Sequence, residues 1–479
     1  IVKSRFHTWV MIMGNFEQYD TALIVEDDKA HFLHPWQEFD KFNKTGALPI
    51  AQAEGPYIYD TDGNRLLDAV GGMWCTNIGL GRVEMAEAIA DQARQMAYAN
   101  PMVDMTNVPG SQLAKKLAQL APGDLNHVFF SCGGSTAIDS ALRLIHFYQN
   151  VRGMTAKKHI ISRQEAYHGS TYAAMSISGK QADHIPEFDY MTETVHHLSC
   201  PYFYRAPEGL SEAAFTDMLI AEFQEKITEL GGADKVAAFF AEPIMGSGGV
   251  IVPPENYLKR MWEVCQENDI LFVADEVVTA FGRLGHWFAS EAVFNVQPDI
   301  ITTAKGLTSG YQPLGATIFS ERIWQVISAP GNGRYFAHGF TYTGHPVACR
   351  AALKNIEIIE REGILEHVRE VGPYFLQQLK TLEQLPIVGE VRGNHFMVCI
   401  ENVASKGTRL LFPDDVNIGQ RITDECASRG VLIRPIGHLN VLSPSLVLTV
   451  DEIDRIVATL RDGISAVMVA LQAQSLWTE

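Results

Sequence analysis

Short apolar runs recur through the middle of the chain, separated by longer segments with helical periodicity. The runs are rich in β-branched and aromatic residues, and their alternation with helical segments is typical of a mostly parallel sheet covered by helices. One intervening segment, residues 135–148, places its apolar side chains at helical spacing. The candidate strands are 128–130, 159–162, 237–241, 270–274, 300–302 and 316–319.

The pattern changes towards both ends of the chain. Residues 57–68 alternate around Asp62-Gly63, which predicts a hairpin with a tight turn. A chain of 479 residues also exceeds the size of one compact core. We therefore expect an α/β fold with a large domain over 80–345 and a smaller α+β domain built from 1–79 and 346–479. Within the last segment the pattern predicts helices over 346–361, 365–382 and 451–472.

Composition narrows the classes of function. A formal charge of −18 argues against a nucleic-acid-binding face or an anionic membrane surface, because both need a basic excess. No apolar run reaches the roughly 18 residues of a membrane span. The seven cysteines are scattered and form no CxxC pair, which favours reduced thiols in the cytoplasm over a disulfide framework or a metal cluster.

Two charged residues follow apolar strands and indicate chemistry. Asp275 closes the run 270–274, and Lys305 follows the run 300–302. A carboxylate in a buried crevice is costly unless a cation pairs with it, and a lysine can bind an aldehyde as an imine. Such a pair suits pyridoxal 5′-phosphate (PLP), held by an imine and by an ion pair to its ring nitrogen. The alternatives are a salt bridge from Asp275 to Arg283 and a surface position for Lys305.

A glycine turn after the strand 128–130 could hold a phosphate. Gly133 and Gly134 let the backbone approach closely, and the N–H groups at the start of the following helix attract an anion. Ser135 could donate its hydroxyl while capping the helix. A plain strand-to-helix turn remains the alternative explanation.

Three further residues follow the ends of predicted strands. Tyr167 or His168 could lie flat on a ring in the crevice where open α/β sheets bind ligands, or could simply pack. Glu242 could orient a hydroxyl of the cofactor or hold a loop.

With these motifs the chain resembles the class III (omega) aminotransferases, which are fold-type I PLP-dependent transferases, from about residue 30 to the C-terminus. The resemblance implies that Lys305 is the Schiff-base lysine and Asp275 the partner of the ring nitrogen. It also implies a ring between Tyr167 and Val277. The motifs that carry it are Gly133-Gly134-Ser135, Tyr167-His168-Gly169, 274–283, 304–310, 313–316 and 338–346.

The resemblance further implies a homodimer, or a dimer of dimers, with shared active sites. In this family the threonine at the position of Thr341 contacts the phosphate bound by the neighbouring subunit. Two departures concern the phosphate turn, where the family usually has Ser-Gly-Ser-Glu and this chain has Gly133-Gly134-Ser135-Thr136. The lost hydroxyl at 133 predicts one phosphate donor fewer, and the lost carboxylate at 136 predicts different contacts around the turn.

The same resemblance gives expectations for the substrates. Arg434 matches the mobile arginine of omega-transaminases, which binds the acceptor carboxylate, although a surface arginine is the alternative. Trp74, Tyr167 and Phe340 would form an apolar pocket. We expect an amine or omega-amino acid as donor and pyruvate as acceptor; the alternatives are 2-oxoglutarate as acceptor, or an enzyme specific for taurine or β-alanine with pyruvate.

Three other classes of protein are alternatives to a class III aminotransferase. An aminomutase or decarboxylase of the same fold would share every cofactor residue. A PLP-binding regulator would carry a DNA-binding module, for which this acidic chain shows no sign. A nicotinamide dehydrogenase would need a GxGxxG motif after an early strand.

Overall fold

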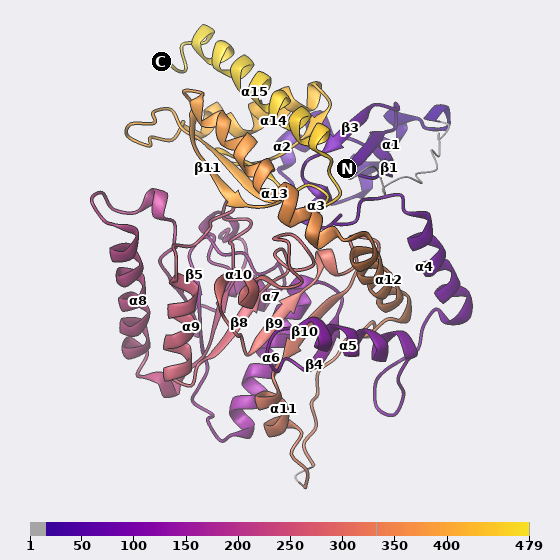
Figure 1. Ribbon diagram of the computed structural model, residues 1–479, viewed down its shortest axis with the longest axis vertical. Coiled ribbons are helices and arrows are strands. Elements are labelled where there is room, and N and C mark those ends of the chain that lie inside the picture. The colour runs from indigo at the N-terminus through magenta and orange to yellow at the C-terminus, as the bar shows by residue number, and fades with distance from the viewer. Residues whose placement is uncertain (1–15, 332, 479) are drawn as a thin grey trace.

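A seven-stranded sheet lies at the centre of the molecule (Figure 1). The computed structural model describes residues 16–331 and 333–478, so residues 1–15 of the predicted N-terminal segment lie outside the described residues. The strand order is β4-β10-β9-β8-β7-β5-β6, and β10 alone runs antiparallel to its neighbours. The strands are β4 (His127–Ser131), β5 (His159–Arg163), β6 (Val195–Leu198), β7 (Val236–Ala241), β8 (Leu271–Asp275), β9 (Ile300–Thr303) and β10 (Gly315–Phe319). The prediction of a mostly parallel sheet is confirmed. Strand β6 is the one strand of this sheet that the sequence pattern did not predict.

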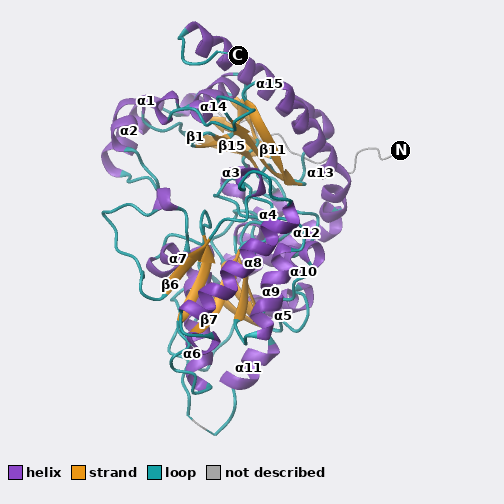
Figure 2. Cartoon of the chain, turned by 90° about the vertical axis from the view of Figure 1, so that its left-hand side faces the viewer, coloured by secondary structure: helices purple, strands orange, loops and turns teal. Residues whose placement is uncertain are grey.

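Helices cover both faces of this sheet (Figure 2). Alternation along the strands explains why: in β7, Ala238 and Phe240 pack on one face, whereas Phe239 and Ala241 pack on the other. The first face carries α6 (Gly134–Val151), α7 (Tyr172–Ile177) and α11 (Glu321–Ile327). The second carries α5 (Val108–Leu120), α8 (Glu212–Glu229), α9 (Tyr257–Glu267) and α12 (Pro346–Glu362).

Strands from the two ends of the chain meet above the central sheet. The short strand β13 pairs in parallel with β3, placing Val431 opposite Leu67. The first of the two smaller sheets contains β1 (Ile50–Glu54), β2 (Tyr57–Asp60), β3 (Arg65–Asp68) and β13 (Val431–Leu432). The second contains β11 (Val388–Asn394), β12 (Met397–Asn402), β15 (Leu439–Leu442) and β14 (Arg434–Ile436). Pairing of the two ends agrees with a small domain of mixed origin, while the boundaries at 79/80 and 345/346 stay predictions.

The helices outside the central layers belong mostly to the two ends of the chain. They are α1 (Thr21–His31), α2 (Phe39–Thr45), α3 (Gly71–Trp74), α4 (Val83–Met96), α10 (Ala289–Phe294), α13 (Ile364–Lys380), α14 (Ile418–Ser428) and α15 (Val450–Ala473). Among the described residues, α15 is the one helix whose length and composition would allow it to cross a membrane. Its apolar side, with Ile456 and Ile464, is buried against the neighbouring α13 and α14. Burial of this kind is typical of a core helix.

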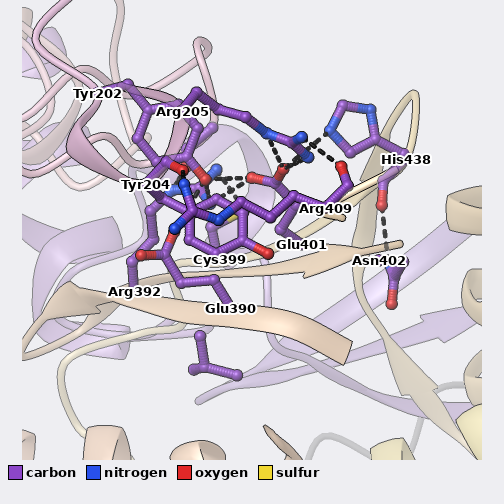
Figure 3. Close-up of polar contacts among 12 residues, drawn as sticks. Tyr202, Tyr204, Arg205, Glu390, Arg392, Cys399, Glu401, Asn402, Arg409 and His438 are labelled. Carbon is purple, nitrogen blue, oxygen red and sulfur yellow. Dashed lines mark hydrogen bonds and ion pairs between the residues drawn. The ribbon is translucent and has the colours of Figure 1, made fainter. Parts of the chain in front are cut away.

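A buried ion network joins the second small sheet to the segment after β6 (Figure 3). Arg392 on β11 binds Glu401 on β12, with 2.6 Å between Nη1 and Oε2, and donates Nε–H to the carbonyl of Gly249 at 2.8 Å. Glu401 also accepts hydrogen bonds from Tyr202 and Arg205. Burial alone would raise the pKa of Glu401, but a hydrogen bond from His438, the charge of Arg392 and the donors Tyr202 and Arg205 hold this pKa well below its usual range. The network therefore stabilises the fold above the usual carboxyl pKa, and this contribution is lost as the pH falls.

Replacement of Arg392 by Met is expected to lower the free energy of unfolding by about 3 kcal/mol, because Glu401 would keep a buried charge with fewer partners. Denaturant unfolding followed by circular dichroism measures the change. Arg409, an exposed arginine at the edge of the same network, is the matched control. Its replacement by Met should cost no more than about 1 kcal/mol. Equal losses for the two variants would contradict a special role for Arg392.

Candidate active site

A cavity of about 820 Å³ opens at the carboxyl ends of the parallel strands. Asp275 ends β8, Lys305 follows β9, and Glu242 follows β7, so the three side chains converge on one edge of the sheet. The other predicted site residues that line the cavity are Trp74, Gly134, Ser135, Tyr167, His168, Val277 and Arg434. Most of the residues that the sequence singled out are therefore brought together.

Asp275 lies almost fully buried at the floor of this cavity. Its Oδ2 accepts a hydrogen bond from Nδ1 of His168 at 2.7 Å, and its Oδ1 accepts one from the backbone N–H of Val277 at 3.1 Å. His168 in turn lies 3.2 Å from the hydroxyl of Ser162 through Nε2. These contacts fix the carboxylate in place. His168 is thus a partner of Asp275, which leaves Tyr167 as the aromatic residue that can face a bound ring.

The alternative ion pair between Asp275 and Arg283 is not present. Arg283 is fully buried elsewhere, where it donates to the backbone carbonyls of Phe396 and Pro444 and to Oδ1 of Asn77. The carboxylate of Asp275 consequently stays available to a cation in the cavity.

Lys305 begins a short 3-10 helix, η5 (Lys305–Leu307), directly after β9. Its backbone has φ 42°, a left-handed conformation that costs energy for a non-glycine residue and is often found at functional sites. Its Nζ lies 5.9 Å from the ring centroid of Trp74. Burial lowers the pKa of Lys305, opposed by the charges of Asp275, Cys75 and Glu242. A lowered pKa increases the fraction of neutral amine, which is the form that attacks a carbonyl and accepts a proton.

The glycine turn between β4 and α6 has the shape of a phosphate cradle. The helix begins at Gly134, and its first N–H groups have no partner inside the helix. A Cβ atom at position 134 would lie 3.1 Å from Cγ1 of Val277, so a side chain there would crowd the cavity wall. Backbone N–H groups can therefore approach an anion at this point.

The prediction that Ser135 caps α6 is wrong. Gly133 is the N-cap residue, and the hydroxyl of Thr136 accepts hydrogen bonds from the N–H groups of Gly133 and Cys132 at 3.0 and 3.1 Å. Ser135 lies inside the first turn, and its hydroxyl accepts a hydrogen bond from the N–H of Ser170 at 3.0 Å. The hydroxyl of Thr136 therefore accepts hydrogen bonds from the turn that a carboxylate at this position of the usual family motif could accept.

Glu242 supports the wall beneath Tyr167. Its two carboxylate oxygens accept hydrogen bonds from the N–H groups of Tyr167 and Gly246, at 3.0 and 2.7 Å. Burial raises the pKa of Glu242. A Cβ atom at Gly246 would lie 2.2 Å from the ring of Trp74, so this glycine allows the loop after β7 to pack against the tryptophan. Glu242 thus holds a loop, which is one of the two roles that its position in the sequence predicts.

Arg434, the first residue of β14, also lines the cavity. Its guanidinium carbon lies 6.0 Å from the ring centroid of Trp74, and Nη1 contacts Sδ of Met73. No carboxylate in the described part of the chain lies within ion-pair distance of Arg434. Burial lowers the pKa of Arg434, opposed by Tyr167 and Asp183. A half-buried guanidinium without an anionic partner is suited to bind a carboxylate from solution.

Three predicted site residues do not line this cavity: Gly133, Phe340 and Thr341. Thr341 is exposed, and Phe340 packs against His338 rather than against Trp74 and Tyr167. The expected apolar pocket of Trp74, Tyr167 and Phe340 is therefore incomplete within a single chain.

The cavity also contains side chains that the sequence did not indicate. Trp36, Lys180 and Asp183 line it, and the ring of Trp36 lies 5.8 Å from that of Tyr167. They come from segments without a recognisable motif. No pattern in the sequence could have assigned them to the cavity.

The donor set fits PLP. Asp275 provides a fixed carboxylate for a protonated ring nitrogen, Lys305 an amine of lowered pKa, and the start of α6 free N–H groups for a phosphate. Tyr167 and Val277 line the cavity between these points. Fold and site together define a fold-type I PLP-dependent enzyme.

Comparison with known proteins gives the family. A family model described as aminotransferase class-III matches residues 41–464, and the chain belongs to this family of PLP-dependent transaminases. The putrescine–pyruvate aminotransferase of Pseudomonas aeruginosa is 39% identical over 92% of this chain and 96% of its own length.

Solved structures agree with this assignment. An (S)-enantioselective omega-transaminase from Thermomicrobium roseum has a TM-score of 0.90 and 37% identity, covering 95% of this chain and 99% of its own. The omega-transaminase of Pseudomonas jessenii, solved in complex with PMP, has a TM-score of 0.90 and 32% identity, covering 94% and 99%. The protein is a class III aminotransferase, and PLP is its cofactor.

Proposed function

We propose that this enzyme transfers an amino group from a primary amine or omega-amino acid to pyruvate, giving alanine. The observation that carries the proposal is Arg434, an unpaired guanidinium in the same cavity as Lys305 and Asp275. A small oxo acid needs one such group to hold its carboxylate. The similarity to an enzyme named for putrescine and pyruvate supports both the donor class and the acceptor.

Each side chain of the site has a defined task. Bound PLP supplies a conjugated ring that can accept electrons from the amine-bearing carbon. Asp275 would hold a positive charge at the ring nitrogen of bound PLP, and its hydrogen bond from His168 keeps the carboxylate in position. Lys305 is positioned to take the proton from the amine-bearing carbon of the substrate. The same amine could then return the proton to the cofactor carbon that carried the aldehyde. We propose that Tyr167 and Val277 hold the ring between them and that Gly133, Gly134 and Ser135 bind the phosphate.

Replacement of Arg434 by Ala is expected to raise the KM for pyruvate by about 10- to 100-fold, the effect of losing a charged hydrogen bond. The KM for an apolar amine such as 1-phenylethylamine should change by less than about 3-fold, because that donor carries no carboxylate. Steady-state kinetics with each substrate varied in turn give both values. If both KM values rise equally, the role in acceptor binding is wrong.

A donor panel tests the proposed reaction. Purified protein is incubated with pyruvate and, in turn, a monoamine, a diamine, β-alanine and taurine, and alanine is measured by chromatography. Alanine formed with at least one donor is the expected result. Alanine formed only after pyruvate is replaced by 2-oxoglutarate and glutamate would rule out the proposed acceptor. An aminomutase or decarboxylase would produce no alanine with any donor.

A homodimer would complete the site. Phe340 and Thr341 do not line the cavity of their own chain, and Tyr98 donates a hydrogen bond to the carbonyl of Thr341 at 2.8 Å. Exposed apolar side chains gather in the two segments that contain Tyr98 and Thr341, residues 98–108 and 335–342. They are Tyr98, Met102, Val103, Met105, Val108, Tyr335 and Tyr342. A patch of this kind favours an interface between subunits. We propose that Thr341 of each subunit reaches the phosphate bound by the other, as the family resemblance implies.

A cytoplasmic location is proposed from the cysteines. All seven have free thiols, and several are fully buried, so none contributes to a disulfide framework. Unpaired thiols are typical of a reducing compartment.

A further inference from the structure

The exposed end of the active cavity carries a carboxylate that the proposed reaction does not use. Asp183 lines the cavity together with Trp36, and its side chain is only 8% exposed. It comes after α7, in a short 3-10 helix, η2 (Gln181–Asp183). A carboxylate this enclosed, facing a cavity built for small molecules, needs a cationic or hydrogen-bonding partner.

The partners that Asp183 has within the described residues do not satisfy it. Its Oδ1 accepts one hydrogen bond, from Nε1 of Trp36 at 3.3 Å, and Nζ of Lys180 lies 3.7 Å away. A charge-assisted hydrogen bond is shorter, about 2.7–2.9 Å, and an ionised carboxylate offers about four acceptor positions. Lys180 therefore attracts Asp183 without occupying its acceptor positions.

The charges around Asp183 leave its carboxylate able to bind an incoming cation. Glu165 is half-buried near Lys180 and Asp183, and burial raises its pKa, with Lys180 opposing this effect and Asp183 adding to it. No ion pair of Glu165 is found among the described residues. Glu165 has Lys180 and His438 as positive neighbours, and Asp183 also acts on Arg434 in the same cavity. Lys180 is the cation within ion-pair distance of Asp183 among the described residues, so acceptor positions of this carboxylate stay open to a second ammonium group.

Aromatic rings provide the rest of the subsite. The rings of Trp36 and Tyr167 lie 5.8 Å apart at an angle of 66°, and both line the cavity beside Asp183. The faces of tryptophan and tyrosine attract cations, and the attraction is larger where water is partly excluded. The indole N–H also fixes the carboxylate that it binds.

We propose that Asp183, with Trp36 and Tyr167, binds the second ammonium group of a diamine donor. This assignment rests on the proposed transamination and narrows its donor class to diamines. The two substrates then use separate groups of opposite charge: Arg434 binds the carboxylate of the acceptor, and Asp183 binds the distal ammonium of the donor. One cavity can thus accept both substrates in turn, although the distal ammonium of the donor is positive and the carboxylate of the acceptor is negative.

The test compares two donors that differ only in the distal charge, 1,4-diaminobutane and n-butylamine, with pyruvate as acceptor. The wild-type enzyme should prefer the diamine, measured as the ratio of the two kcat/KM values. Replacement of Asp183 by Asn, which keeps the shape and removes the charge, should lower this ratio by about 10- to 100-fold. Replacement of Asp189 by Asn, an exposed acid on the same loop that does not line the cavity, should leave the ratio unchanged.

A binding measurement separates recognition from turnover. In the Lys305→Ala background, absorbance titration of the PLP-loaded protein gives a Kd for each amine. Adding Asp183→Asn should raise the Kd of the diamine at least about 10-fold more than that of n-butylamine. Equal changes for the two amines, or a wild-type enzyme without preference for the diamine, would overturn the subsite. If neither amine yields alanine, the proposed reaction fails instead, and the titration still decides whether Asp183 recognises the second charge.

Discussion

Replacement of Lys305 by Ala is expected to reduce turnover by about 10⁴-fold or more. The side chain supplies two functions at once: a nucleophilic amine for the cofactor aldehyde and a base for the proton of the substrate. Its position in the cavity leaves water poorly placed to substitute, and burial lowers its pKa, which favours the neutral amine. Steady-state formation of alanine measures the loss. Because Asp275 and the phosphate cradle remain, the variant should still bind PLP without a covalent bond.

Two controls make this result specific. Borohydride reduction of the wild-type holoenzyme should attach the cofactor to the peptide that contains Lys305, and the variant should show no attachment. Replacement of Lys158 by Ala, a lysine outside the cavity, should leave the rate unchanged. Attachment to another peptide, or turnover near the wild-type rate in Lys305→Ala, would contradict the assignment.

Much of the fold could be predicted because burial on both faces of a parallel strand leaves a continuous apolar run. The runs at β7 and β8 are of this kind. Strand β6 was missed because its sequence, Val195-His196-His197-Leu198, places two histidines in an edge strand that has one neighbour, β5. Edge strands tolerate polar residues, so their pattern is weak.

The candidate site could be predicted only where residues follow strands. Asp275, Glu242 and Lys305 lie next to runs whose ends are readable from the sequence, and the sheet brings those ends together. Trp36 reaches the cavity from a turn and Asp183 from the short 3-10 helix η2, and neither segment is long enough for a periodic pattern to fix the position of a side chain. Serine is a favoured capping residue, which predicts a cap at Ser135, but the hydroxyl of Thr136 bonds back to the turn and the helix begins at Gly134 with Gly133 as its N-cap.

Replacement of Asp275 by Asn is expected to lower kcat by about 10²- to 10³-fold, the cost of removing one fixed charge that acts on the reacting system. Asparagine has the same shape, so the hydrogen bond from His168 at 2.7 Å can be kept by the amide oxygen. The amide NH₂ group would then face the ring nitrogen. It cannot accept a proton from that nitrogen, and it carries no charge to keep the nitrogen protonated, so the ring accepts electrons less well.

A second buried acid serves as the matched control. Asp299 precedes β9, and its Oδ2 accepts a hydrogen bond from the N–H of Phe272 at 2.9 Å, outside the residues that line the cavity. Replacement of Asp299 by Asn should lower stability, because a buried hydrogen-bonded carboxylate is changed, yet kcat of the folded enzyme should stay near its wild-type value. Pre-steady-state absorbance of each half-reaction measures the chemical step in both variants. A wild-type rate for Asp275→Asn would mean that the carboxylate on β8 does not act on the cofactor ring, since its partners among the described residues are His168 and the N–H of Val277, and no described lysine or arginine lies within ion-pair distance.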